Sequence, residues 1–129
     1  MAEKAAVRTD DAPAPFQGAP YSQAVRYGDL VFVAGQVGLA AGHDALAGDS
    51  AEAQTEQACE NLATILDAAG SSFAKVLNTT IYLSDFGDFA AVNEVYGRYV
   101  GDKPPARATV QVAALPMGAR VEIAVVAHV

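Results

Sequence analysis

The sequence predicts an α+β fold in which a β-sheet carries two helices on one of its faces. Five stretches of the chain are rich in apolar and β-branched residues over lengths typical of strands. Two further stretches place apolar residues three and four positions apart, which is typical of an amphipathic helix. Each of these helices lies between strands, so crossover connections should bring both helices to the same face of the sheet.

Length and charge limit the class of protein. The 129 residues have the size of one ordinary domain, and we predict a single domain over residues 1–129. Fifteen acidic residues against eight basic ones give a net charge of −7, which disfavours nucleic-acid binding because phosphates need a basic face. No segment approaches the roughly 18 to 20 consecutive apolar residues of a membrane span. The chain also begins without the apolar segment of a secretory signal.

The cysteine and histidine residues do not predict a metal site. A single cysteine, Cys59, can form neither an internal disulfide nor a Cys-rich zinc site, and it fits a cytoplasmic protein. The two histidines, His43 and His128, share no metal-ligand spacing. We therefore expect any catalysis to proceed without a bound metal.

The N-terminal part is predicted to hold an arm and two strands. Residues 1–14 are rich in Ala, Pro and charge without periodicity, and are expected to form a flexible arm. Strands are predicted over Tyr21–Tyr27 and Leu30–Val37, with a tight turn between them. The second is almost continuously apolar, as in a strand buried on both faces. A Gly/Ala-rich loop over Gly38–Gly48 follows.

The first helix is predicted to begin after Asp49 or Ser50, either of which can cap it, and to end at Gly70. Its apolar face is formed by Thr55, Ala58, Cys59, Leu62, Ile65, Leu66 and Ala69. A β-branched strand over Val76–Leu83 comes next.

Asp85 or Asp88 is predicted to cap the second helix, and the Pro104-Pro105 pair prevents its continuation. Its apolar stripe consists of Phe89, Val92, Tyr96 and Val100.

The last two strands are predicted over Arg107–Ala114 and Val121–Val129, with a turn at residues 115–118 that suggests a hairpin. Both faces of the last strand are largely apolar. Because no helix is available for the second face of the sheet, that face predicts an oligomer.

Two charged residues in these strands are candidates for chemistry. Arg107 shares a strand face with Thr109 and Gln111, and an Arg among short uncharged neighbours can bind a small carboxylate with both arms of its fork. Glu122 interrupts an apolar strand, where a raised pKa would let it hold or activate a water. The alternative is a structural Arg107–Glu122 ion pair, since such pairs are common.

The expected geometry weakens that alternative. A hairpin turning near Met117 would place Arg107 opposite residue 127 and Glu122 about five residues nearer the turn, on the order of 16 Å away. The two side chains would then not meet within one chain, although they could meet across a subunit interface.

Four motifs resemble a known family. The segment from Pro105 to Ile123, Pro-Ala-Arg-Ala-Thr-Val-Gln-Val-Ala-Ala-Leu-Pro-Met-Gly-Ala-Arg-Val-Glu-Ile, resembles the C-terminal signature of the RidA (YjgF) family of enamine/imine deaminases. Residues 19–24 are similar to its Gly-Pro-Tyr segment, residues 33–37 to its Ser-Gly-Gln strand and residues 88–96 to its second helix. The resemblance covers the chain from about Pro13 onward.

This resemblance implies a chorismate-mutase-like fold with a mixed β-sheet, assembled as a homotrimer with sites at the subunit interfaces. It implies hydrolysis of 2-enamino and 2-imino acids, such as those derived from 2-aminoacrylate, to 2-keto acids and ammonia, and no cofactor or metal. These substrates include 2-iminobutanoate and 2-iminopropanoate.

The family pattern also implies roles for six residues of this chain. Arg107 would bind the substrate carboxylate, assisted by the backbone N–H of Thr109, and Glu122 would position the water. Tyr21 would line the pocket, the Gly35 backbone would contact the ligand, and Asn93 matches a helix residue near the site. Ala34 and Thr109 depart from the Ser and Cys that are common in the family.

Two other functions are compatible with the same resemblance. One is a non-catalytic trimeric protein that binds small ligands or acts like a chaperone in the same cleft. The other is a ribonuclease or translation inhibitor, which the acidic charge disfavours.

Overall fold

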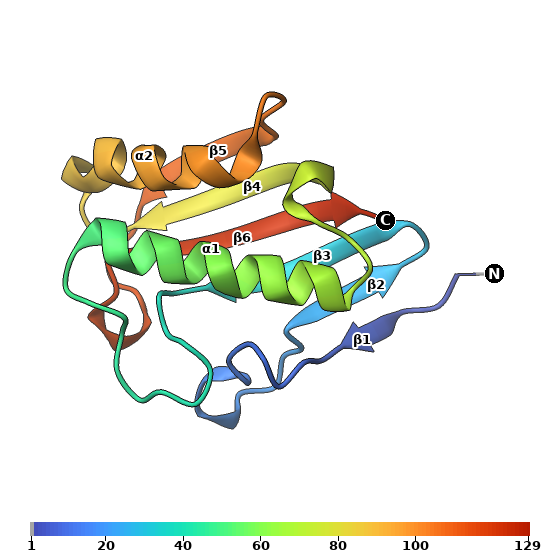
Figure 1. Cartoon of the computed structure of the whole chain (residues 1–129). Helices are drawn as coiled ribbons and strands as arrows, with labels where there is room; N and C mark the ends of the chain where they lie inside the picture. The colour runs from blue at the N-terminus through green and yellow to red at the C-terminus, as the bar shows by residue number, and fades with distance from the viewer. Residues whose placement is uncertain (1) are drawn as a thin grey trace.

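The computed structural model describes residues 2–129, which form a six-stranded mixed sheet with two helices packed on one face (Figure 1). The strands are β1 (Ala5–Val7), β2 (Ala24–Tyr27), β3 (Leu30–Gln36), β4 (Val76–Leu83), β5 (Ala106–Gln111) and β6 (Val121–His128). The helices are α1 (Ala51–Ala68) and α2 (Phe89–Val100). The predicted fold class is confirmed. No helix in this part of the chain has the length and apolar character needed to cross a membrane.

The strand order is β1-β2-β3-β6-β4-β5, and only β4 and β5 run parallel. The expected hairpin between the last two strands is therefore wrong, because β4 lies between them. Helix α2 forms the crossover between β4 and β5, which lets β5 run parallel to β4 and pair with it at the edge of the sheet. The chain then passes β4 through the turn at Pro116–Gly118 and enters the centre of the sheet as β6.

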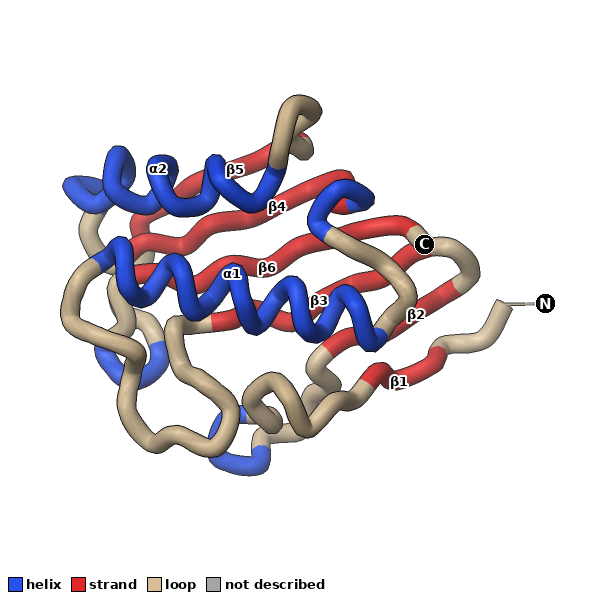
Figure 2. Tube along the Cα trace, in the orientation of Figure 1, coloured by secondary structure: helices blue, strands red, loops and turns tan. Residues whose placement is uncertain are grey.

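Both helices lie over the same face of the sheet (Figure 2), and the hydrophobic core lies between them and the sheet. Residues of α1 and α2 pack there against inward-facing residues of the central strands. The fully buried large side chains include Leu62, Ile65, Leu66, Ile81, Leu83 and Ile123. Cys59 is among the buried residues, and burial raises the pKa of its thiol to about 12, which makes it an unreactive core residue.

The helix-free face is apolar but open. Leu30 and Phe32 are 39% and 47% exposed, so the expectation that this strand is buried on both faces is wrong. Phe32 pairs with Val126 of β6, and Tyr27 pairs with Leu30, which places all four on the same side of the sheet. A sheet face of this kind is typical of a surface that another subunit covers.

The N-terminal arm has more structure than its composition predicts. Ala5–Val7 pairs with β2 as an edge strand, and Ala12 is buried in the core. Buried Gln23 fixes the segment between them, because its amide donates to the carbonyls of Thr9, Ala12 and Pro13 and its oxygen accepts from the Thr9 N–H. The expected flexible arm over residues 1–14 is thus wrong for residues 5–13.

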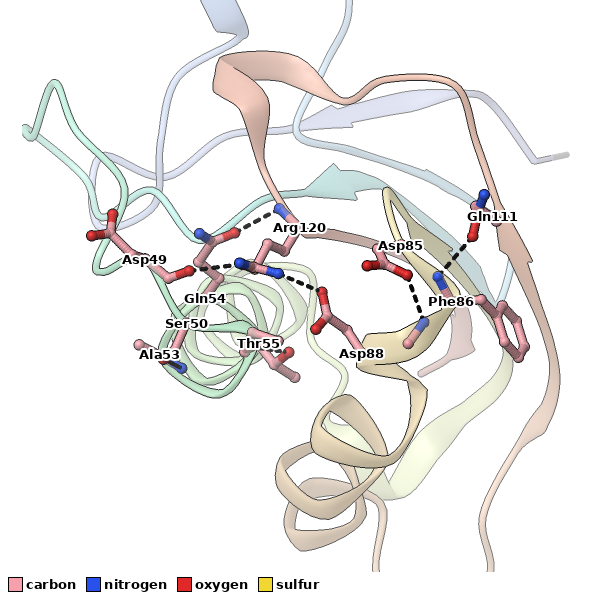
Figure 3. Close-up of polar contacts among 12 residues, drawn as sticks. Asp49, Ser50, Ala53, Gln54, Thr55, Asp85, Phe86, Asp88, Gln111 and Arg120 are labelled. Carbon is pink, nitrogen blue, oxygen red and sulfur yellow. Dashed lines mark hydrogen bonds and ion pairs between the residues drawn. The ribbon is translucent and has the colours of Figure 1, made fainter.

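Helix α1 is capped as predicted, with the Ser50 side chain accepting a hydrogen bond from the Ala53 N–H. Asp85 accepts from Gly87 N–H and caps the short 3₁₀ turn that precedes α2. Asp88 does not cap α2 with its side chain; it forms an ion pair of 3.0 Å with Arg120 (Figure 3).

Arg120 joins three elements at this end of the sheet. Besides the ion pair, its Nε donates to the Asp49 carbonyl at 2.8 Å, and its backbone N–H donates to the buried Gln54 side chain (Figure 3). The chain just before β6 is therefore tied to the beginnings of both helices.

Candidate functional site

The six predicted site residues form two groups on opposite faces of the sheet. We call the group on the helix-covered face the arginine half-site, formed by Arg107, Thr109 and Asn93. We call the group on the helix-free face the glutamate half-site, formed by Glu122, Gly35 and Tyr21. Each group combines residues that are far apart in the sequence.

Arg107 is held between two aromatic rings of α2. Its Cζ lies 5.3 Å from the centre of the Tyr96 ring and 5.5 Å from that of Phe89. Ring faces attract cations, so the rings hold the guanidinium without using its N–H donors. Among residues 2–129, no carboxylate forms an ion pair with Arg107. The donors of the fork are thus available for an external anion.

Helix α2 contributes Asn93 to the arginine half-site as well as the two rings. Asn93 lies four residues after Phe89 and three before Tyr96, which places it on the same helix face. The Tyr96 hydroxyl donates to Thr79 Oγ1 at 2.8 Å, which fixes the ring beside the strand. The sequence predicts both rings as part of the apolar stripe of this helix, and that pattern does not reveal their contact with Arg107. Their seven-residue spacing around a polar Asn is the signal that could have indicated it.

Strand β5 leaves the edge of the sheet open beside Arg107. The Val112 N–H donates to the Leu83 carbonyl of β4 at 2.9 Å. Because backbone groups alternate in direction along a strand, the N–H of Thr109 points away from β4, toward the open edge. This donor lies two residues from Arg107 along the strand and is not used by β4.

Glu122 lies in a hollow on the helix-free face. The hollow is lined by Phe16, Tyr21, Gly35 and Pro116 as well as Glu122. Burial raises the pKa of the Glu122 carboxyl above its ordinary value of 4.5. A carboxylate whose pKa is raised is a stronger base toward a water that it contacts.

Gly35 is required by the position of Glu122. A Cβ at position 35 would lie 2.5 Å from Glu122 Oε2 and 2.8 Å from Cδ. These distances are shorter than carbon–oxygen and carbon–carbon contacts allow. A larger residue at position 35 would displace the Glu122 carboxylate from its place against the backbone of β3.

Tyr21 lies outside β2, in the turn that precedes it, which corrects the predicted start of that strand. Its hydroxyl accepts a hydrogen bond from the Phe16 N–H at 2.6 Å. Gln17 and Met117, at the two 3₁₀ turns beside the hollow, have left-handed backbones with φ of 54° and 60°. Strained non-glycine residues of this kind occur often at binding sites.

The two half-sites cannot combine within one chain. Thr79 pairs with Arg107 across β4 and β5, whereas Tyr82 pairs with Glu122 across β4 and β6. Residues 79 and 82 of a strand point to opposite faces, so Arg107 and Glu122 do as well. The alternative of an intrachain Arg107–Glu122 ion pair is therefore wrong. The prediction that the two side chains do not meet within one chain holds, although the reason is the intervening strand β4 and the opposite faces, not a hairpin.

A comparison with protein families identifies the chain. The model described as Endoribonuclease L-PSP matches residues 9–129. The chain belongs to this family, which is also known as the YjgF/RidA family. The resemblance found in the motifs is thereby confirmed.

Relatives within the L-PSP family match over nearly the whole chain. Protein DfrA of Myxococcus xanthus is 48% identical over 129 residues, covering 98% of this chain and 96% of that protein. The 2-iminobutanoate/2-iminopropanoate deaminase of Mus musculus is 45% identical over 121 residues, covering 94% and 88%. The crystal structure of RidA from an Antarctic Psychrobacter superposes with a TM-score of 0.90 at 41% identity, covering 97% and 99%.

The contact between Gly35 and Glu122 gives a first prediction. The substitution Gly35→Ala should displace the Glu122 carboxylate, and because this is the end of a flexible side chain the fold should lose only about 0.5–1.5 kcal/mol. In a Glu122→Ala background the same substitution should cost far less, which a double-mutant cycle in urea measures. As a control, Gly97→Ala on α2, where a Cβ meets nothing within 4 Å, should stabilise by up to about 1 kcal/mol. Equal costs of Gly35→Ala in both backgrounds would contradict the contact.

Proposed function

We propose that this protein is a cytoplasmic enamine/imine deaminase that hydrolyses 2-enamino and 2-imino acids to 2-keto acids and ammonia. The observation that carries the proposal is Arg107, a cation held by two aromatic rings with its donors available at an open strand edge. Such a cation is suited to one small carboxylate. The deaminase name of the mouse relative supports the same reaction.

The working site is proposed to form between subunits of a homotrimer. The arginine half-site of one chain would meet the glutamate half-site of a neighbour, because the two lie on opposite faces of each sheet. The exposed apolar side chains on the helix-free face support an assembly that covers this face.

The proposed chemistry begins with substrate binding. The fork of Arg107 and the N–H of Thr109 would hold the carboxylate, while Asn93 and Tyr21 line the two walls. A protonated imine is already an electrophile, so positioning a water and accepting its proton are sufficient. These contributions amount to several kcal/mol of the barrier without a metal or cofactor.

Glu122 would accept the proton of the water as its oxygen bonds to C2 of the imine. The resulting carbinolamine then takes that proton on its nitrogen. The C–N bond breaks, ammonia leaves, and the hydroxyl proton is lost as the carbonyl of the 2-keto acid forms. One water is consumed and one ammonium is released for each substrate, so the protons balance.

An imine-hydrolysis assay tests this function. An amino-acid oxidase with catalase generates 2-iminopropanoate from alanine, and the loss of imine absorbance is followed above the spontaneous rate. We expect acceleration by this protein, and a loss of kcat/KM of about two orders of magnitude or more in Arg107→Ala. The control Arg98→Ala, an exposed arginine on α2, should retain activity. No acceleration with several imino acids would instead favour the non-catalytic ligand-binding protein.

The raised pKa of Glu122 predicts the pH dependence of the reaction. Glu122 must be ionised to accept a proton, so kcat/KM should fall as the pH falls through a pKa above 4.5. The acidic limb should disappear in Glu122→Gln, with kcat/KM lowered about 10²- to 10⁴-fold at neutral pH. The exposed Glu52→Gln variant should keep the profile of the unmodified protein. An unchanged acidic limb in Glu122→Gln would assign it to another group.

A composite site predicts complementation between inactive variants. Arg107→Ala and Glu122→Ala should each be inactive alone. When the two are unfolded together and refolded as a mixture, about a quarter of the sites should combine an intact Arg107 with an intact Glu122 from different chains. Recovery of about that fraction of activity supports the interface site, and sedimentation should give about three times 13.3 kDa. A stable monomer, or a mixture without activity, would contradict it.

A further inference from the structure

Phe86 is a large aromatic residue beside the arginine half-site that the proposed function does not use. It begins the short 3₁₀ turn Phe86–Asp88 between β4 and α2, and it is 45% exposed. Because much of the side chain remains in water, it gives only part of the stabilisation of a fully buried phenylalanine. The contacts of the ring are therefore a better guide to its role than its burial.

The ring of Phe86 stacks on the ring of Phe89. The two ring centres lie 4.9 Å apart, and the planes differ by 15°. Phe89 is one of the two rings beneath the Arg107 guanidinium, whose Cζ lies 5.5 Å from its centre. Stacked rings attract each other, and ring faces attract cations. Phe86, Phe89 and Arg107 thus form a continuous series of contacts that ends at the cation of the arginine half-site.

Two hydrogen bonds fix the backbone that carries Phe86 (Figure 3). The Phe86 N–H donates to the Gln111 side-chain oxygen at 2.8 Å, and the Gly87 N–H donates to Asp85 Oδ1 at 2.8 Å. Gln111 lies four residues after Arg107 on the same face of β5. The turn is therefore tied to the strand that carries the cation, and the Phe86 ring is held beside it.

The two rings beneath Arg107 are fixed in different ways. Tyr96 is buried, and its hydroxyl donates to Thr79 Oγ1 at 2.8 Å. Phe89 is only partly buried, lies at the first position of α2, and has no polar atom that could form such a bond. Its stack with Phe86 takes the place of the hydroxyl anchor and restricts the rotation of the ring.

We propose that Phe86 is a positioning residue that orients the Arg107 guanidinium through the Phe89 ring. The inference rests on the proposed function, in which Arg107 binds the substrate carboxylate. With the stack in place, Phe89 presents a fixed face, and the arginine fork is oriented before the carboxylate arrives. Without the stack, the ring changes rotamer more freely, and the fork must be ordered during binding, which weakens it.

Truncation of Phe86 should weaken carboxylate binding. Phe86→Ala should raise the KM for 2-iminopropanoate, and the Kd for the product pyruvate by titration calorimetry, by about 3- to 10-fold, the range that the loss of an aromatic stack gives. The kcat should stay nearly unchanged, because the carboxylate is held equally in the ground and transition states. Phe86→Tyr keeps the ring and should restore both constants to within about twofold of the original.

A double-mutant cycle tests whether Phe86 acts through Phe89. In a Phe89→Leu background, Phe86→Ala should change KM and Kd by less than about twofold, because no ring is left to orient. Phe73→Ala is the matched control: Phe73 pairs with Tyr99 of the same helix at 5.4 Å and packs against the core. Its loss should lower stability in urea more than Phe86→Ala does and leave KM unchanged.

The outcomes separate this inference from the proposed function. Unchanged KM and Kd in Phe86→Ala, no restoration in Phe86→Tyr, or a full effect in the Phe89→Leu background would overturn the positioning role. An equal rise of KM in Phe73→Ala would overturn it as well, by assigning the effect to lost stability. If the original protein binds pyruvate without accelerating imine hydrolysis, the proposed function fails while the Kd comparison still decides this inference. A protein that neither binds pyruvate nor hydrolyses imines would overturn both.

Discussion

The position of β4 between β5 and β6 is the constraint on which the functional arrangement depends. Residues 79 and 82 of this strand point to opposite faces, and their partners Arg107 and Glu122 follow them. A single chain thus presents its cation on the helix-covered face and its carboxyl on the bare face. A site that uses both must be assembled from two chains, and the apolar bare face supplies the surface for such an assembly.

Each half-site contains a group that is unfavourable in isolation. Arg107 has no counter-ion within the described chain, Glu122 is desolvated, and the Thr109 hydroxyl is buried without a partner. Groups of this kind cost stability unless something satisfies them. In the proposed function, the substrate would pair with the Arg107 cation, and a water would pair with the Glu122 carboxyl. The fold maintains them through aromatic rings, a glycine and two strained turns.

The local elements were predictable because their signals lie within a few residues. Ser50 caps α1 as its sequence context predicts, and β4 has the predicted bounds of Val76–Leu83. The pairing of β5 with β4 was not predictable from the turn at residues 115–118, because a turn does not reveal that another strand intervenes. Strand β1 was missed for a similar reason: its three residues carry no pattern, and the Gln23 that anchors the following segment is up to 14 residues away.

The candidate site shows the same division between local and long-range information. Arg107 and Glu122 could be identified because each is a charge in an otherwise uncharged strand segment within a family motif. The contact of Phe89 and Tyr96 with Arg107 is not predictable from their place in the apolar stripe of α2, since an apolar helix face gives the same pattern whether it covers a sheet or a cation. The need for glycine at position 35 depends on Glu122, 87 positions later, and only the pairing of β3 with β6 brings the two together.

The charge distribution bears on the ribonuclease activity that the family description names. RNA binding requires several cations along a backbone path, since each neutralised phosphate releases counter-ions. Of eight basic residues here, Arg8, Arg98 and Arg120 lie in ion pairs with acidic neighbours, on a chain of net charge −7. Arg107 instead lies over two aromatic rings beside the edge strand. One cation in such a setting favours a single small anion, which is the recognition that hydrolysis of an imino acid requires.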